Sequence, residues 1–172
     1  MAEATVSEVQ AWFAGRVPDG WFSGPPEVSM DGDEMLIVGN LADVEVAKGS
    51  KADAKTAARS ARIDRFREET REQRMRIAQE AEHLFRRKVS WGAACGGERK
   101  LFTTMSTPVM TRLRMTERQV LDTLVESGVA RSRSDALAWC VRLVGQNQES
   151  WIKELREALV KVGQVRQQGP TF

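Results

Sequence analysis

The sequence has few of the residues on which catalytic and metal sites depend. Its 172 residues include one histidine, His83, and two isolated cysteines, Cys95 and Cys140. This supply excludes a disulfide framework and a four-ligand zinc site, and it leaves no Ser/His/Asp or Cys/His set for nucleophilic catalysis. No paired-carboxylate site stands out from the surface acids. We therefore predict a protein that is not an enzyme and that uses no cofactor and no metal.

Long apolar runs are missing as well. No segment approaches the length of about 18 residues expected of a membrane-spanning helix, and the start of the chain lacks the basic and apolar parts of a secretory signal. With 41% hydrophobic residues, the chain has enough apolar material for one globular domain or two small ones. These observations predict a cytoplasmic protein with no membrane partner.

Charge is distributed unevenly along the chain. Residues 1–50 contain two basic and nine acidic residues, whereas the remainder contains 24 basic and 15 acidic residues. A positive field over the later part favours binding to a polyanion such as DNA. The acidic N-terminal part is a candidate surface for a protein partner, and a solvated acidic surface is the alternative.

The first hundred residues alternate between helix and hairpin patterns. Val6, Val9, Trp12 and Phe13 have helical spacing, with Ser7 near the start and Gly15 after the end. Residues 27–38 resemble a β-hairpin, because Asp31-Gly32 suits the positive φ angles of a two-residue turn. Residues 43–55 carry no periodic apolar pattern and predict a flexible linker.

A long helix and a second hairpin are predicted next. Residues 56–88 lack Gly and Pro and carry a narrow apolar stripe that consists of Ile63, Phe66, Ile77, Ala81 and Leu84. The arginines of this segment, which include Arg67, Arg71 and Arg74, are spread round the helix and predict a charged solvent face, with phosphate contact as the alternative. Residues 89–91 and 99–104 flank a loop over residues 92–98. Cys95 in that loop is expected to be a structural thiol, with an exposed, oxidisable thiol as the alternative. Residues 1–105 thus form a predicted α+β domain of helix, hairpin, helix and hairpin.

Residues 109–144 contain the most informative pattern. Residues 109–115 alternate as a strand would, with Val109, Thr111, Leu113 and Met115 on one face and Met110, Arg112 and Arg114 on the other. Thr116 and Gln119 have the spacing of a capping box, which predicts a helix start near Thr116. Gly128 suits the end of this helix. Ser132 and Ser134 offer N-cap hydroxyls for a second helix that is apolar around most of its circumference.

This arrangement resembles the ribbon-helix-helix family of Arc and MetJ type, over residues 109–144 only. The resemblance implies a homodimer in which one strand from each subunit pairs into an antiparallel ribbon that enters the major groove of double-stranded DNA. It implies base contacts by Met110, Arg112 and Arg114. It also implies phosphate contacts where the second helix starts, by Arg131, Ser132, Arg133 and Ser134.

An extra amphipathic helix follows and completes the predicted C-terminal domain over residues 106–165. It carries Trp151, Ile152, Leu155, Leu159 and Val162 and is expected to end at Gly163, before a frayed tail over residues 166–172. The predicted fold is therefore α+β, with a ribbon-helix-helix module and an extra helix after the N-terminal region.

The sequence as a whole predicts a dimeric, sequence-specific DNA-binding protein, a bacterial transcription regulator associated with the nucleoid. Two alternatives remain open. One is a protein-interaction or antitoxin-like module whose DNA binding is secondary or absent. The other is a nucleoid-associated protein with little sequence preference.

Overall fold

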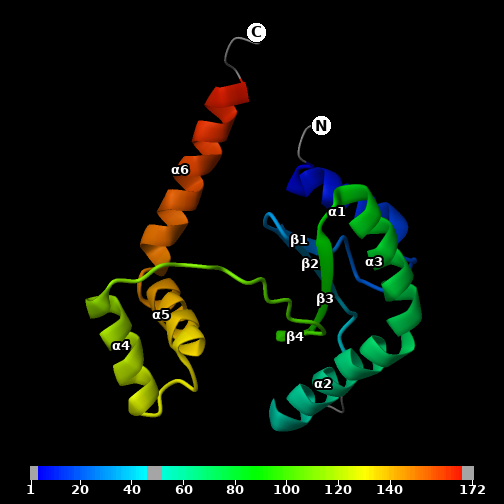
Figure 1. The fold of residues 1–172 in the computed structure, drawn as a ribbon. Helices are drawn as coiled ribbons and strands as arrows, with labels where there is room; N and C mark the ends of the chain where they lie inside the picture. The colour runs from blue at the N-terminus through cyan, green and yellow to red at the C-terminus, as the bar shows by residue number, and fades with distance from the viewer. Residues whose placement is uncertain (1–3, 46–51, 168–172) are drawn as a thin grey trace. The chain divides into compact units, whose positions relative to one another are not determined.

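The computed structural model describes residues 4–45 and 52–167, and the chain divides into two compact units (Figure 1). One unit spans Met1–Pro108 and the other Val109–Phe172. The first combines helices with a sheet, and all elements described in the second are helices. The α+β class predicted from the sequence is confirmed. The predicted domain boundary lay between residues 105 and 106, slightly before this division.

A single four-stranded sheet forms the centre of the N-terminal unit. Its strands are β1 Glu27–Met30, β2 Glu34–Asn40, β3 Lys88–Cys95 and β4 Glu98–Leu101, in the order β1-β2-β3-β4. The outer pairs, β1 with β2 and β3 with β4, are antiparallel, so both predicted hairpins are confirmed. The central pair is parallel, with Ile37 opposite Trp91. The helical segment between β2 and β3 is therefore a crossover connection.

The two hairpin turns differ from their predicted forms. The positive φ angles expected at Asp31-Gly32 are not adopted. Instead, the Asp31 carboxylate accepts hydrogen bonds from the N–H groups of Asp33 and Glu34, both at 2.8 Å. In the second hairpin, strand β3 continues to Cys95 through residues predicted as a loop. The turn is made by Gly96 and Gly97, whose φ angles of 53° and 101° favour glycine.

Helix α1, Val6–Arg16, has Ser7 near its start, as predicted, and its N-cap is Thr5; Gly15, which was predicted to follow the helix, lies within it. The Thr5 hydroxyl accepts from the Glu8 N–H, and the Glu8 carboxylate accepts from the Thr5 N–H at 2.7 Å. This reciprocal capping box satisfies two backbone donors that the helix itself leaves free.

The helices described in this unit pack on one face of the sheet. Side chains at alternate strand positions share a face, and this face carries Val28, Met35, Ile37, Trp91, Ala93 and Cys95. Val9 and Phe13 of α1, together with Ile77 and Ala81 of the later crossover helix, form one core cluster with it. Ile63 and Phe66 of the earlier crossover helix form a second cluster.

The single helix predicted over residues 56–88 is wrong. The structure has two helices, α2 Ala52–Glu69 and α3 Arg71–Phe85, separated at Thr70. The Thr70 hydroxyl donates to the Phe66 carbonyl oxygen at 2.6 Å. A threonine that bonds to the carbonyl four residues earlier commonly bends a helix. After Phe85, Arg86 takes a left-handed conformation with φ 58°, and the chain enters β3.

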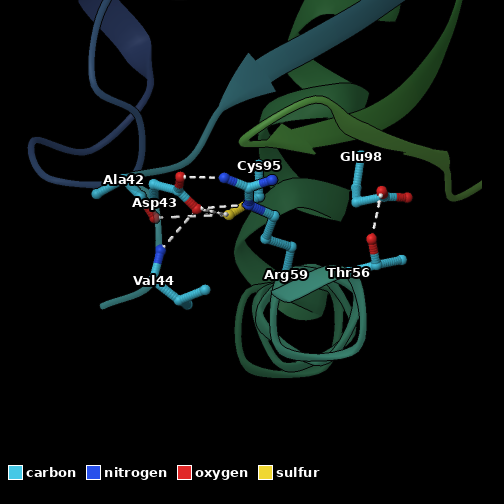
Figure 2. Close-up of polar contacts among 7 residues, drawn as sticks. All are labelled: Ala42, Asp43, Val44, Thr56, Arg59, Cys95 and Glu98. Atoms are coloured by element: carbon cyan, nitrogen blue, oxygen red, sulfur yellow. Dashed lines mark hydrogen bonds and ion pairs between the residues drawn. The ribbon is translucent and has the colours of Figure 1, made fainter. Parts of the chain in front are cut away.

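An ion pair ties the end of β2 to helix α2 (Figure 2). Two nitrogens of the Arg59 guanidinium donate to the Asp43 carboxylate at 2.9 and 2.6 Å and lower the pKa of that carboxyl to about 2. The Cys95 thiol lies 3.7 Å from the Ala42 carbonyl oxygen, and burial raises the pKa of the thiol. Cys95 is therefore a buried group at the end of β3, not an exposed loop thiol.

The flexible linker predicted over residues 43–55 is corrected at both ends. Asp43 is held by Arg59, and residues 52–55 belong to helix α2. Residues 46–51 lie outside the described residues.

The C-terminal unit contains three helices, α4 Met115–Glu126, α5 Arg133–Asn147 and α6 Glu149–Gln167. Its core is small: Leu121, Ala130 and Ala136 are buried, and partly buried side chains pack around them, namely Leu113, Leu124, Val125, Leu137 and Cys140. Helix α6 continues past Gly163, where the prediction ended it, and includes the first two residues of the predicted tail. Residues 168–172 of that tail lie outside the described residues.

Among the helices described here, none is both long enough and apolar enough to cross a membrane.

Candidate nucleic-acid interface

The segment predicted as a DNA-contacting strand is extended and exposed, but it forms no strand within this chain. Residues 103–114 have no regular secondary structure. Val109 is 84% exposed and Met110 is 97% exposed, while Leu113 packs against the small C-terminal core. Of the side chains predicted to face a core, Leu113 therefore does so, whereas Val109 and Met115 do not reach the core.

The two arginines predicted to read bases lie on the surface. Arg112 and Arg114 are both exposed. Of the ion pairs formed among residues 4–45 and 52–167, none involves either side chain. Both guanidinium groups therefore keep their donors available to a ligand.

The first helix of the predicted module starts one residue earlier than expected, with a different cap. The Glu117 carboxylate accepts from the Arg114 N–H at 2.5 Å, so Arg114 occupies the N-cap position, and the predicted capping box of Thr116 and Gln119 is not formed. The Arg118 guanidinium donates to the Leu113 carbonyl oxygen at 2.7 Å. These two bonds fix the backbone that carries Arg112 and Arg114 to the start of α4.

The turn into the second helix agrees with the prediction. Gly128 follows α4 with a φ of 77°, which suits a helix end. Ser132 is the N-cap of α5, and its hydroxyl accepts from the Asp135 N–H at 3.2 Å. The Asp135 carboxylate in turn accepts from the Arg131 N–H at 3.1 Å. The side chains of Arg131 and Ser134 are exposed beside this start.

Arg133, a predicted phosphate contact, is already paired. Its Nε and Nη2 donate to the two oxygens of the Asp122 carboxylate at 2.6 and 2.7 Å. This bidentate pair raises the pKa of Arg133 and lowers the pKa of Asp122. In this conformation Arg133 ties the start of α5 to α4, and the sequence reading missed Asp122 because its partner lies eleven positions away.

A groove of about 340 Å³ brings several of the predicted residues together. It lies between the extended segment and helices α4 and α5, and it is lined by Val109, Met110, Thr111, Leu113, Arg118, Leu121, Arg133, Ser134 and Leu137. The groove thus brings one candidate base contact, Met110, together with two candidate phosphate contacts, Arg133 and Ser134.

Much of the apolar surface of the C-terminal unit is uncovered. The exposed side chains of α4 to α6 and the turns between them include Met115, Val120, Val129, Val141, Leu143, Val144, Trp151, Leu155, Leu159, Val160, Val162 and Val165. These side chains lie on all three helices of the unit that the structure describes, and the small core does not cover them.

A second basic cluster lies at the bend between α2 and α3, among arginines for which the sequence predicted a charged solvent face, with phosphate contact as the alternative. Arg74 is only 7% exposed, and its guanidinium lies 4.7 Å from the centre of the Phe102 ring. It donates to the Thr70 hydroxyl at 2.9 Å and to the Arg67 carbonyl oxygen at 2.7 Å. The Arg67 guanidinium lies 6.0 Å from the same ring centre. Burial, followed by repulsion from Arg67 and Arg71, lowers the pKa of Arg74 to about 10.

Two known families match the chain, one over each unit. The family described as "Rv1265-like protein, N-terminal domain" matches residues 7–101. The chain belongs to the Rv1265-like family. The family described as "Mb1296 C-terminal domain" matches residues 114–166. The two matches are separated by the segment that joins the two units, and neither description names a ligand, a partner or a reaction.

Two mycobacterial relatives span nearly the whole chain. Rv1265 of Mycobacterium tuberculosis and Mb1296 of Mycobacterium bovis, each named an uncharacterized protein, are 54% identical to the chain over 159 residues. The aligned part is 92% of this chain and 69% of each relative. No solved structure matches the chain.

Proposed function

We propose that this chain is a dimeric, sequence-specific DNA-binding protein that regulates transcription, and that it inserts a two-stranded β-ribbon into the major groove. The observation that carries the proposal is the exposed, extended segment with unpaired Arg112 and Arg114, directly before two capped helices with uncovered apolar surface. Pairing of two such segments in an antiparallel ribbon-helix-helix arrangement would give each its missing strand partner.

The uncovered apolar side chains support a second copy of this chain as the dimer partner. A core of three buried residues is small for a unit with three helices, and helices of this length depend on packing of an apolar face for their stability. In a symmetric dimer the same surface of each copy covers the other. A single dimer interface would then pair the two extended segments and cover the exposed apolar side chains of the helices.

The proposed contacts divide into two classes. Arg112 and Arg114 would read bases, because an arginine that makes two hydrogen bonds to guanine discriminates by about 1–3 kcal/mol. Met110 would make apolar contact beside them. Arg131, Ser132 and Ser134 would meet a phosphate at the start of α5, which positions the protein without reading sequence. Arg133 joins them only when Asp122 releases it, so we rank it last.

A double substitution tests the base contacts. The parent and the R112A/R114A variant are titrated by fluorescence anisotropy against a duplex selected from random sequence with the parent, and against an unrelated duplex. Loss of two bidentate contacts should lower affinity for the selected duplex at least about 10-fold and reduce its preference over the unrelated one. R142A/R156A removes two exposed arginines from α5 and α6 and should retain the preference. Equal affinity of R112A/R114A and the parent for the selected duplex would contradict the proposal.

Sedimentation of the same samples tests the dimer. We expect a dimer at micromolar concentration, and a monomer throughout the range in which the protein binds its duplex would refute the shared ribbon.

A protein-interaction or antitoxin-like module is the second candidate, favoured by the apolar surface of α6 and by the acidic residues 1–50. Such a protein keeps its partner after the R112A/R114A change. A nucleoid-associated protein of low specificity would instead bind both duplexes equally, and the variant would weaken both to the same extent.

A further inference from the structure

The arginine cluster of the N-terminal unit consists of Arg67 and Arg74, whose guanidinium groups lie over the Phe102 ring, and of Arg71, whose charge acts on Arg74. Arg67 is near the end of α2, and Arg71 and Arg74 are in the first turn of α3, across the bend at Thr70. Arg74 is held in place by the Thr70 hydroxyl, the Arg67 carbonyl oxygen and the Phe102 ring. Arg67 and Arg71 are exposed above it.

The cluster carries positive charge that no carboxylate of the described chain neutralises. Several other basic side chains of this unit have acidic partners, as in the pairs of Arg16 with Glu80 and Lys100 with Asp64. Within residues 4–45 and 52–167, no ion pair includes Arg67, Arg71 or Arg74. Burial lowers the pKa of Arg74 to about 10, and repulsion of its charged form by Arg67 and Arg71 adds to this shift. A bound anion would relieve this repulsion.

We propose that the arginine cluster binds the phosphodiester backbone of duplex DNA, so that the N-terminal unit contributes contacts of its own. The inference rests on the proposed DNA-binding function. Arg67 and Arg71 supply the donors that meet phosphate oxygens, and an arginine fork fits phosphate geometry in a bidentate way. Arg74 is a positioning residue: it adds a fixed positive charge below them, held against the face of Phe102.

The position of the cluster in the chain fits this assignment. Phe102 is followed directly by residues 103–114, which reach the start of α4 without regular structure. Fully extended, this segment spans about 40 Å. That distance corresponds to about 12 base pairs at about 3.4 Å each. The cluster can therefore meet the same duplex as Arg112 and Arg114 at a separation of up to about 12 base pairs.

Salt dependence measures the number of phosphates that a protein contacts. Each neutralised phosphate releases counterions and adds about 0.9 to the slope of log affinity against log salt concentration. We expect the R67A/R71A variant to have a slope shallower by about 1.8 than the full-length parent. When the salt concentration is raised from 0.05 to 0.2 M, the affinity of R67A/R71A should accordingly fall by a factor about 12 times smaller than that of the parent. Preference for the selected duplex over an unrelated one should not change, since backbone contacts carry no sequence information.

Two further variants separate a phosphate contact from a general effect of charge. R65A/R76A removes the same charge from the other side of the segment, as judged by helical spacing, and should keep the parental slope. R67K/R71K keeps both charges and should also keep it. Circular dichroism spectra and thermal unfolding should be the same for R67A/R71A and the parent, because the substituted side chains are exposed.

The possible failures point to different assumptions. If the parent binds no duplex, the proposed function and this inference are both refuted. If the parent binds and R67A/R71A has the parental slope, the cluster is not a contact although the proposed function stands. An equal loss of slope in R65A/R76A would also overturn the inference, because it would show long-range attraction instead of a site.

Discussion

Replacement of Gly39 by alanine should destabilise the N-terminal unit by crowding one aromatic ring. Gly39 lies buried in β2 on the face that carries the core, with an ordinary backbone conformation. A Cβ atom at this position would overlap Cε1, Cδ1 and Cζ of the Phe22 ring. The ring cannot turn away freely, because Trp21 and Phe66 pack against it with ring centres at 6.2 and 5.5 Å.

The expected magnitude follows from the behaviour of crowded cores. An added methyl group that forces a packed side chain to move costs about 1–3 kcal/mol. Phe22 is only partly buried, so F22A should cost about 2 kcal/mol, below the range of about 3–5 for a fully buried phenylalanine. In the G39A/F22A variant the new methyl group occupies space that the ring has left. The combined loss should therefore be smaller than the sum of the two single losses by about 1–2 kcal/mol.

Urea unfolding, followed by the fluorescence of Trp21 and its neighbours, measures the free energy of unfolding. It is carried out on the parent, the two single variants and the double variant. The slope of the transition should remain constant, so that shifts in midpoint report stability. A loss below about 0.5 kcal/mol for G39A, or strict additivity in the double variant, would refute the steric reasoning.

Three further changes are expected to have simpler outcomes. The pKa of Asp43 is about 2 in the folded protein, below its unfolded value. Its pairing with Arg59 therefore stabilises the fold above about pH 4, and this stabilisation is lost as the pH falls toward 2. The D43N variant should lack this loss, so its urea midpoint should change less between pH 4 and pH 2 than that of the parent. S132A removes the N-cap of α5 and should cost about 1 kcal/mol in thermal unfolding, most of which S132N restores. G15A places a methyl group in open space near the end of α1, and it should raise the free energy of unfolding by about 0.5 kcal/mol or more; a decrease would show that the glycine is needed there.

The local elements of the fold were predictable because their signals lie within a few residues. Helix α1 and both hairpins carry their periodicity and turn residues in short segments, and so does the Ser132 cap of α5. The parallel pairing of β2 with β3 had no such signal. Two hairpins separated by a helical stretch have the same local pattern whether or not they join in one sheet, and only the burial of both central strands decides it.

The bend at Thr70 shows where a sequence signal was present but misinterpreted. The apolar stripe of Ile63, Phe66, Ile77 and Ala81 continues in phase through two polar positions, Thr70 and Arg74. Both are buried in the structure. A gap of this kind marks polar side chains that satisfy one another, here with a bent backbone, and not an interrupted core.

The candidate interface stays a prediction, because exposure does not separate its two faces. Met110, Arg112 and Arg114 are exposed, and so are Val109 and Met115 of the face expected to meet a core. Asp122 and Glu117, which determine how Arg133 and Arg114 are held, form bonds that depend on helix ends and on the return of α5 beside α4. In the proposed ribbon the partner strand comes from a second copy, and a single chain does not contain it.

The parallel pairing of β2 with β3 bears on how the protein emerges from the ribosome. The Cys95 thiol and the Ala42 carbonyl are separated by 53 positions, and Arg99 meets Glu27 across 72. Closure of such wide loops is slow compared with formation of helices whose contacts are local. During synthesis the leading hairpin must therefore wait with an open edge until β3 has been translated. The helices of the second unit form from local contacts and need no such delay. A nascent chain is therefore most prone to misassembly while the N-terminal unit is being translated and the edge of β2 is still unpaired.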